Sequence, residues 1–296
     1  MSELTLVYFG HHKCASRYIT AIFRQTASLL GLQPCRTDHL SAELPLGYHL
    51  RAPYAALLHK RRGRLLTDPA MVMCLSNGDS EAVDLLEQRG AYRGFHIIRD
   101  PRDILVSAYF SHRYSHAIPG DGGWMAEFRH ALNTAPDIER GLLLEMKFSA
   151  ANFRRMATWN FGNPTIYEGR YETLIVDPVL EFSRIFNFLG IKTPWPGLQP
   201  MIRMAVTYLG WRLFKRPMPM GTTLPMPVLR YLVDRNSFQH RSQGRRPGQE
   251  NQTHHYRKGI AGDWRNYFTP RITDTFKECY GDLLIQLGYE SSSDWL

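Results

Sequence analysis

The stretch LTLVYFGHHKCASRYITAIF, residues 4–23, decides the fold of this chain. Its first part, Leu4–Phe9, is a short apolar run that ends at Gly10, which predicts a buried strand. Apolar residues then recur at helical spacing, so we expect a helix from about Ala15 to Leu30. The polar residues between them form a loop. The stretch therefore predicts a strand-loop-helix unit.

The loop of this unit, residues 10–18, has the features of an anion site. Free backbone N–H groups at the start of a helix attract negative charge, and the helix dipole adds to the attraction. Lys13 and Arg17 contribute positive charge, and Ser16 contributes a hydroxyl. The Walker A pattern GxxxxGK[ST] does not occur, which counts against an ATPase or an ordinary kinase. We expect the loop to bind an anionic group.

Similar strand and helix signals recur along the chain. Further strands are expected at Met71–Leu75, Phe95–Ile98 and Ile166–Tyr171. Amphipathic helices are expected around Leu85, before Gly190 and before Gly288. The alternation predicts an α/β fold with three layers, in which a central parallel sheet carries helices on both faces and a phosphate-binding strand-loop-helix.

We expect one domain over residues 1–296, because the chain shows no internal repeat and no clear linker. Residues 192–256 are expected to form an insertion on one side of it, such as a lid. A chain of 296 residues with 44% hydrophobic content is long enough to bury a full core. These values indicate an ordinary globular protein.

The chain is basic, with a formal net charge of +9, but its 36 Lys and Arg residues form no long basic run. A small, highly anionic ligand accounts for part of this excess. A nucleic-acid partner is not expected, because no helix-turn-helix or stacking motif appears and the cations sit in separated loops.

The four cysteines form no CxxC pair and are far apart in the sequence. This spacing argues against a zinc site and a disulfide framework, and it fits a reducing compartment. No signal peptide and no apolar run of about 18 residues are visible, so we expect a cytoplasmic location.

A second cationic turn is RKGIAGDW, residues 257–264. Arg257 and Lys258 directly precede Gly259, whose backbone can approach a ligand closely. A guanidinium group forms paired hydrogen bonds with phosphate oxygens, and an ammonium group adds a point charge. The turn therefore predicts a second phosphate contact.

A third candidate segment is HIIRDPRDILVSAY, residues 96–109. Arg99 follows a predicted strand, and therefore lies at the carboxyl edge of the sheet, where open α/β folds bind ligands. Asp100 can cap the next helix, and Pro101 can occupy its first turn. Ser107 lies about two turns into that helix, so it can face the same crevice.

These segments resemble those of the PAPS-dependent sulfotransferases, where PAPS is 3′-phosphoadenosine 5′-phosphosulfate. Residues 257–264 match the family's RKGxxGDW segment, and residues 99–109 match its RxPxDxxVSxY motif, both of which bind the 3′-phosphate. Residues 10–18 are similar to the PKSGTTW loop that binds the 5′-phosphosulfate. Here Cys14 and Ala15 replace Ser-Gly, and Arg17 replaces a hydroxyl residue.

Two shorter segments add to the resemblance. Residues 170–174, RYETL, are similar to the family's RYEDL segment, whose Tyr contacts adenine, and residues 236–238, NSF, look like the TSF element, whose Phe stacks on adenine. The resemblance thus implies that PAPS is held by Lys13, Cys14, Ala15, Ser16, Arg17, Tyr18, Arg99, Ser107, Tyr171, Ser237, Phe238, Arg257, Lys258 and Gly259.

The implied activity is transfer of a sulfuryl group from PAPS to an acceptor hydroxyl or amine, with Lys13 as the catalytic cation. The general base stays open, because the place of the family's KTH histidine, Cys74–Asp79, contains no His. His12 is the favoured catalytic base, and Asp79, His49 and Glu145 are the alternatives. A kinase-like nucleotide-binding protein or a catalytically degenerate PAPS-binding protein is the alternative function.

No metal is expected. Adjacent histidines such as His11-His12 and His254-His255 are poor ligands for one ion, and no third ligand accompanies either pair at a recognisable spacing.

The acceptor cannot be identified from the sequence, and neither can the oligomeric state. Residues 201–216 carry an apolar helical stripe flanked by basic residues. Three interpretations stay open: a lid packed over the active site, a site for a small-molecule or lipid-like acceptor, and a peripheral contact with an anionic membrane.

Overall fold

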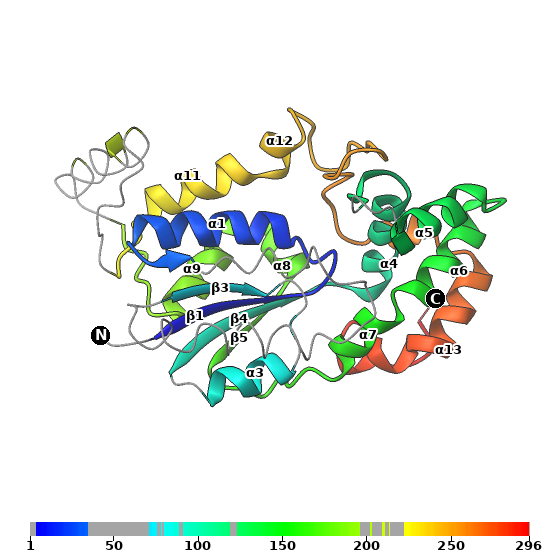
Figure 1. Ribbon diagram of the computed structural model, residues 1–296, viewed down its shortest axis with the longest axis horizontal. Helices are drawn as coiled ribbons and strands as arrows, with labels where there is room; N and C mark the ends of the chain where they lie inside the picture. The colour runs from blue at the N-terminus through cyan, green and yellow to red at the C-terminus, as the bar shows by residue number, and fades with distance from the viewer. Residues whose placement is uncertain are drawn as a thin grey trace.

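The predicted N-terminal strand is the middle strand of a five-stranded parallel sheet (Figure 1). The strand order is β2-β3-β1-β4-β5. The strands are β1 (Thr5–Gly10), β2 (Gln33–Pro34), β3 (Met71–Leu75), β4 (Tyr92–Ile98) and β5 (Ile166–Arg170). The four longer strands lie where the sequence predicts them.

The structure is a computed structural model. It describes residues 4–34, 71–75, 78, 80–88, 91–118, 123–195, 202, 209–210, 213 and 222–295. Two alternatives for the general base, His49 and Asp79, lie outside the described residues, as does most of the stretch 201–216.

The two faces of the sheet are covered by different helices, and the alternating side chains of β1 pack against both sets. Leu6 and Tyr8 pack into a cluster with α1 (Ser16–Leu29), α9 (Pro178–Phe188) and α11 (Met226–Asn236). Val7 and Phe9 pack on the opposite face with α3 (Ser80–Glu87). Side chains alternate along a strand, so both faces of β1 are apolar and buried. The predicted three-layer α/β fold is confirmed (Figure 1).

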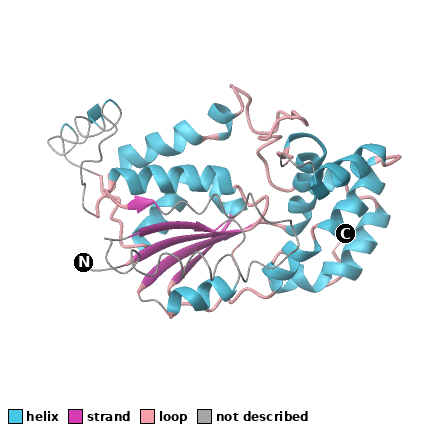
Figure 2. Cartoon of the chain, viewed as in Figure 1, coloured by secondary structure: helices cyan, strands magenta, loops and turns pink. Residues whose placement is uncertain are grey.

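A helical body stands beside the carboxyl edge of the sheet (Figure 2). It contains α4 (Pro101–Phe110), α5 (Gly123–Thr134), α6 (Ile138–Phe148), α7 (Ala150–Ala157) and α13 (Pro270–Gln286). Buried residues of α4, α6, α7 and α13 form one apolar cluster. The sequence patterns predict α4 and α13 but not α5, α6 or α7.

Helix α4 begins as its sequence predicts. Pro101 occupies the first turn, and the Asp100 carboxylate accepts a hydrogen bond of 2.9 Å from the Arg102 backbone N–H. The helix continues into a π-helical turn, η2 (Ser111–Ser115). The shorter elements are α8 (Tyr171–Val176), α12 (Phe238–Arg241) and the 3-10 turn η3 (Asp263–Asn266).

The segment predicted as an insertion, residues 192–256, includes α11. Leu229 and Leu232 of this helix are buried against the sheet-side core. Within the stretch 201–216, the three described apolar side chains are exposed, by 60% at Ile202, 55% at Leu209 and 64% at Leu213. No helix in the described ranges is long and apolar enough to cross a membrane.

The strand order creates a topological switch point between β1 and β4. From β1 the chain passes through α1 to the strands on one side, whereas β4 and β5 lie on the other side. Because β1 and β4 are parallel neighbours, with Gly10 opposite Ile97, their following loops leave the same edge side by side. Ligands of open α/β folds bind at such a point.

The loop after β1 holds two non-glycine residues in left-handed conformations. Lys13 has a φ of 65° and Ala15, the residue before α1, has a φ of 60°. A side chain makes this conformation unfavourable by about 1–2 kcal/mol per residue. Ala15 occupies the position of the glycine in the similar PKSGTTW loop. The tight turn therefore forms here with a strained backbone at Ala15.

We predict that Ala15→Gly raises the free energy of unfolding by about 0.5–1 kcal/mol. Relief of about 1–2 kcal/mol of strain exceeds the loss of about 0.5–1 kcal/mol in backbone entropy. The control is Ala126→Gly in α5, which should lower the free energy of unfolding by about 1 kcal/mol. Urea denaturation measures both. Equal losses in the two variants would show that residue 15 is not left-handed.

Candidate functional site

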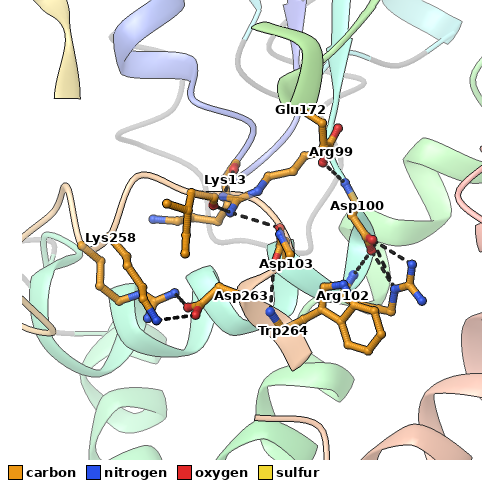
Figure 3. A network of polar contacts seen from close by, with 12 residues as sticks. Lys13, Arg99, Asp100, Arg102, Asp103, Glu172, Lys258, Asp263 and Trp264 are labelled. Carbon is orange, nitrogen blue, oxygen red and sulfur yellow. Dashed lines mark hydrogen bonds and ion pairs between the residues drawn. The ribbon is translucent and has the colours of Figure 1, made fainter. Parts of the chain in front are cut away.

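The Arg99 guanidinium connects the three cationic segments. Its Nη1 donates to the main-chain carbonyl of Lys13 at 3.2 Å, and its Nη2 donates to that of Ile260 at 3.3 Å (Figure 3). The group also lies 4.3 Å from the centre of the Tyr171 ring. Only 7% of Arg99 is exposed. Residues 13, 99 and 260 therefore meet at one place, although up to 247 positions separate them in the sequence.

Asp103 makes the second connection. Its buried carboxylate accepts hydrogen bonds from the backbone N–H groups of Gly262, at 2.7 Å, and Trp264, at 3.0 Å (Figure 3). It also lies 3.7 Å from Arg99, one turn earlier. Burial raises the pKa of Asp103, while Arg99 and the two backbone amides act in the opposite direction. Asp103 thus anchors the turn at residues 257–264 to α4.

Both cations of the 257–264 turn contact Asp263. Arg257 donates to one carboxylate oxygen, and the Lys258 ammonium lies 2.5 Å from the other. Arg257 also pairs with Glu250. Hydrogen bonds from Lys258 and Arg257 hold the pKa of Asp263 below its usual value, although burial opposes them. The sequence predicts Asp263 only as part of the turn, whereas here it positions both predicted phosphate contacts.

The loop after β1 brings Lys13 close to these cations. Burial lowers the pKa of Lys13 to about 7, and the charges of Arg99, Arg17 and Arg257 contribute in the same direction. The part of the chain that the structure describes provides no hydrogen bond or ion pair to the Lys13 ammonium group. Lys13 is therefore a half-buried amine among other positive charges, which is a favourable position for an anion.

The other predicted residues of this loop have internal roles. The Ser16 hydroxyl donates to the His11 carbonyl at 3.2 Å and accepts from the Tyr8 hydroxyl at 3.4 Å. The Cys14 side chain is fully buried. Arg17, in contrast, is exposed.

Two of the predicted adenine-side residues contact the cationic segments, Phe238 at Gly259 and Tyr171 at Arg99. Phe238 packs against Gly259, where an added Cβ atom would lie only 2.4 Å from the Phe238 ring. Gly259 has a φ of 69°, so this turn requires glycine both for space and for conformation. Ser237 caps α12, because its hydroxyl accepts from the His240 backbone N–H at 3.3 Å.

Tyr18 and Tyr171 lie near the starts of α1 and α8. Tyr171 is buried beneath Arg99, and Tyr18 packs edge-on against Phe182. Burial raises the pKa of both tyrosines. Ser107, on α4, is half-buried.

A histidine-carboxylate chain extends from His12 into the helical body. His12 Nε2 lies 3.2 Å from His112 Nε2, and His112 Nδ1 lies 2.8 Å from Glu145 Oε2. Glu145 is fully buried and also accepts from the Ser149 hydroxyl at 2.8 Å. Burial lowers the pKa of His12 well below its usual value, with further lowering from His112 and Lys13.

His112 is not among the residues predicted from the sequence, and Glu145 is predicted only as one alternative for the general base. A signal was present, since His112 and His116 are four residues apart in a segment that follows a predicted helix start. Histidines at this spacing lie on one side of a helix.

The chain is similar to known proteins over much of its length. The sequence pattern of the sulfotransferase domain matches residues 92–208 and 220–288. Bovine sulfotransferase 1A1 is 23% identical over 198 residues, which cover 66% of this chain and 55% of that protein. Human sulfotransferase 1C2 is 24% identical over 191 residues, which cover 62% of this chain and 52% of that protein. The match thus spans about half the length of these curated relatives.

A solved structure shares the fold. The crystal structure of mouse sulfotransferase SULT7A1 complexed with PAP has a TM-score of 0.53 and 13% sequence identity. The similarity covers 96% of this chain and 84% of that one. The loop at residues 10–18 lies outside the residues matched by the domain pattern. It is assigned to the site because Arg99 donates a hydrogen bond to the Lys13 carbonyl.

We predict that Asp103→Asn lowers the free energy of unfolding by about 2–3 kcal/mol. The amide replaces one accepting oxygen with a donor that faces a backbone N–H, so a buried donor loses its partner. Asp137→Asn is the matched control, because Asp137 caps α6 at an exposed position where Asn is an equally good cap. Urea denaturation of both variants measures the difference. If both variants lost the same free energy of unfolding, Asp103 would not anchor the turn at residues 257–264 to α4.

Proposed function

Because this chain belongs to the sulfotransferase domain family, we propose that it is an enzyme that transfers a sulfuryl group from PAPS to a hydroxyl or amine of a small-molecule acceptor. The observation that carries this proposal is the bridging of the three predicted nucleotide segments by one side chain, Arg99. Their convergence at the carboxyl edge of the sheet supports a single ligand that touches all three.

The donors at this site suit a nucleotide that carries two anionic groups, a 3′-phosphate and a 5′-phosphosulfate. Lys13 has an ammonium group without a hydrogen-bonding partner in the described ranges, and Arg99 Nε is likewise buried and unpartnered there. Buried polar groups are normally hydrogen-bonded, so unused donors among like charges favour an anionic ligand. Arg257 and Lys258 would then hold the 3′-phosphate, and Phe238 and Tyr171 would line the adenine side.

PAPS supplies an activated sulfuryl group when it is bound. For this reaction the chain's own residues mainly position the partners and stabilise negative charge, as in phosphoryl transfer. Lys13 would hold the negative charge that develops on the leaving oxygen. Arg99 and Asp103 would act as positioning residues that keep the loops at residues 10–18 and 257–264 in place.

His12 is the proposed general base. It is adjacent to Lys13 in sequence, and its Nε2 contacts His112, whose Nδ1 is directed to the Glu145 carboxylate. An ionised carboxylate accepts a hydrogen bond, so Glu145 would orient His112 and stabilise positive charge on it. His112 and Glu145 are then positioning residues for a proton that His12 takes from the acceptor.

Nucleotide binding is the first test. Adenosine 3′,5′-bisphosphate at 100 times its dissociation constant should stabilise the protein by about 2.7 kcal/mol relative to the ligand-free form, and AMP, ATP or an oligonucleotide at the same concentration should stabilise it less. Thermal unfolding with each ligand measures this. Arg257→Ala should weaken bisphosphate binding about 10–100-fold through loss of charge-assisted hydrogen bonds, whereas Arg246→Ala, at an exposed position of the same region, should not. Stabilisation by ATP alone would favour the kinase-like alternative.

Turnover is the second test. Lys13→Ala should reduce the rate of sulfuryl transfer from labelled PAPS by about 100–1000-fold, because a preorganised donor at the leaving oxygen is lost. The exposed Lys147 on α6 is the control, and Lys147→Ala should keep the wild-type rate. The measurement requires a screen of acceptors with hydroxyl and amine groups. Bisphosphate binding without turnover of any acceptor would instead support a degenerate PAPS-binding protein.

A further inference from the structure

Three histidines from two separate segments meet at one place, and one of them is the proposed base, His12. His12 follows β1, whereas His112 and His116 belong to the π-helical turn η2 and its C-terminal end. One imidazole nitrogen from each lies within 4.8 Å of the other two. His12 Nε2 and His112 Nε2 are 3.2 Å apart. Two nitrogens bound to one tetrahedral zinc ion, each at about 2.0–2.1 Å, are separated by roughly the same distance.

The hydrogen bonds around this cluster leave nitrogens available for a metal. His112 Nδ1 lies 2.8 Å from a carboxylate oxygen of Glu145, and His116 Nδ1 lies 2.9 Å from the Ala117 carbonyl. Both acceptors require the Nδ1 atom to carry the hydrogen, so a lone pair remains on Nε2. Metal-binding histidines almost always donate their second ring N–H to a carboxylate or a carbonyl in this way.

Glu145 gives a separate argument for a positive charge at this position. Its side chain is fully buried, and its only ion-pair partner in the described ranges is His112. Buried charges in proteins are paired or take part in metal coordination. A divalent ion on the opposite nitrogen of His112 would provide the compensating charge through the ring.

The π-helical turn makes the cluster geometrically feasible. The His116 backbone N–H donates to the Ser111 carbonyl at 2.7 Å, five residues earlier, which widens the turn that carries His112 and His116. Such single π-turns within helices occur frequently at functional sites.

From these contacts we infer that His12, His112 and His116 form a binding site for a divalent transition metal, with zinc as the favoured ion. Imidazole suits zinc, copper and nickel, whereas magnesium and calcium prefer oxygen ligands. Three protein ligands leave one position of a tetrahedral ion open. This inference reverses the expectation of no metal, because His12 is joined not by its neighbour His11 but by two histidines, His112 and His116, from a segment about 100 residues away.

The site does not depend on the proposed sulfuryl transfer, but it overlaps with the proposed base. A bound ion takes up the lone pairs of His12 and His112, so those nitrogens cannot accept a proton at the same time. The metal-bound form should therefore lack the base.

The test uses tag-free protein titrated with Co²⁺, whose visible d–d absorption is strong when the ion is tetrahedral, followed by displacement with Zn²⁺. The wild-type protein should bind one equivalent with tetrahedral bands that Zn²⁺ removes. Glu145→Gln should weaken binding about 10–100-fold, as expected for the loss of a group that orients a ligand. His116→Ala, which removes a half-buried ligand, should weaken binding further.

His130→Ala is the matched control, because His130 is exposed on α5 and should not affect binding. If Glu145→Gln does not fold, His116→Ala still decides the question. The proposal is overturned if wild-type protein shows no saturable tetrahedral bands, or if His116→Ala binds Co²⁺ as tightly as wild type. The contact between His12 and His112 would then be an ordinary hydrogen bond. No step requires PAPS or an acceptor, so failure here leaves the sulfotransferase proposal intact.

Discussion

The buried pair formed by Arg99 and Asp103 holds the site together. Arg99 donates to main-chain carbonyls of two loops, and Asp103 accepts from two backbone amides of the second loop. These groups sit one helical turn apart at the junction of β4 and α4, so a rigid part of the fold fixes two irregular segments. A buried polar group that loses its partner is costly, so the geometry of the loops and the positions of both side chains depend on each other.

Because Arg99 brings the cationic segments together, positive charge is concentrated at the carboxyl edge of the sheet. Lys13, Arg99 and Arg257 lie close enough for their repulsion to add to the effect of burial on the pKa of Lys13. Asp263 neutralises part of this charge and fixes Arg257 and Lys258 in advance. A ligand with several negative charges would offset the remaining repulsion, and the overall net charge of +9 is consistent with such a ligand.

Two members of the histidine-carboxylate chain, His112 and Glu145, come from the helical body and not from the sheet. Glu145 on α6 and His112 on η2 contact each other in a buried position, and His12 reaches them from the loop after β1. The body packs against the edge of the sheet through residues such as Ile98 and Trp264, which belong to its apolar cluster. Its position therefore decides which polar side chains face Lys13.

The sequence by itself determined the four longer strands, the start of α4 at Pro101, the approximate start of α1 and the three cationic segments, because apolar patterning, caps and motifs are local properties of the chain. It did not identify α5, α6 or α7; α5, for example, buries only Met125 and Leu132. Only the tertiary structure decided that Asp263 holds both cations, that Phe238 packs on Gly259 and that His112 meets His12. The physical reason is that a contact across 100 residues depends on how strands and helices pack, and no local pattern encodes that packing.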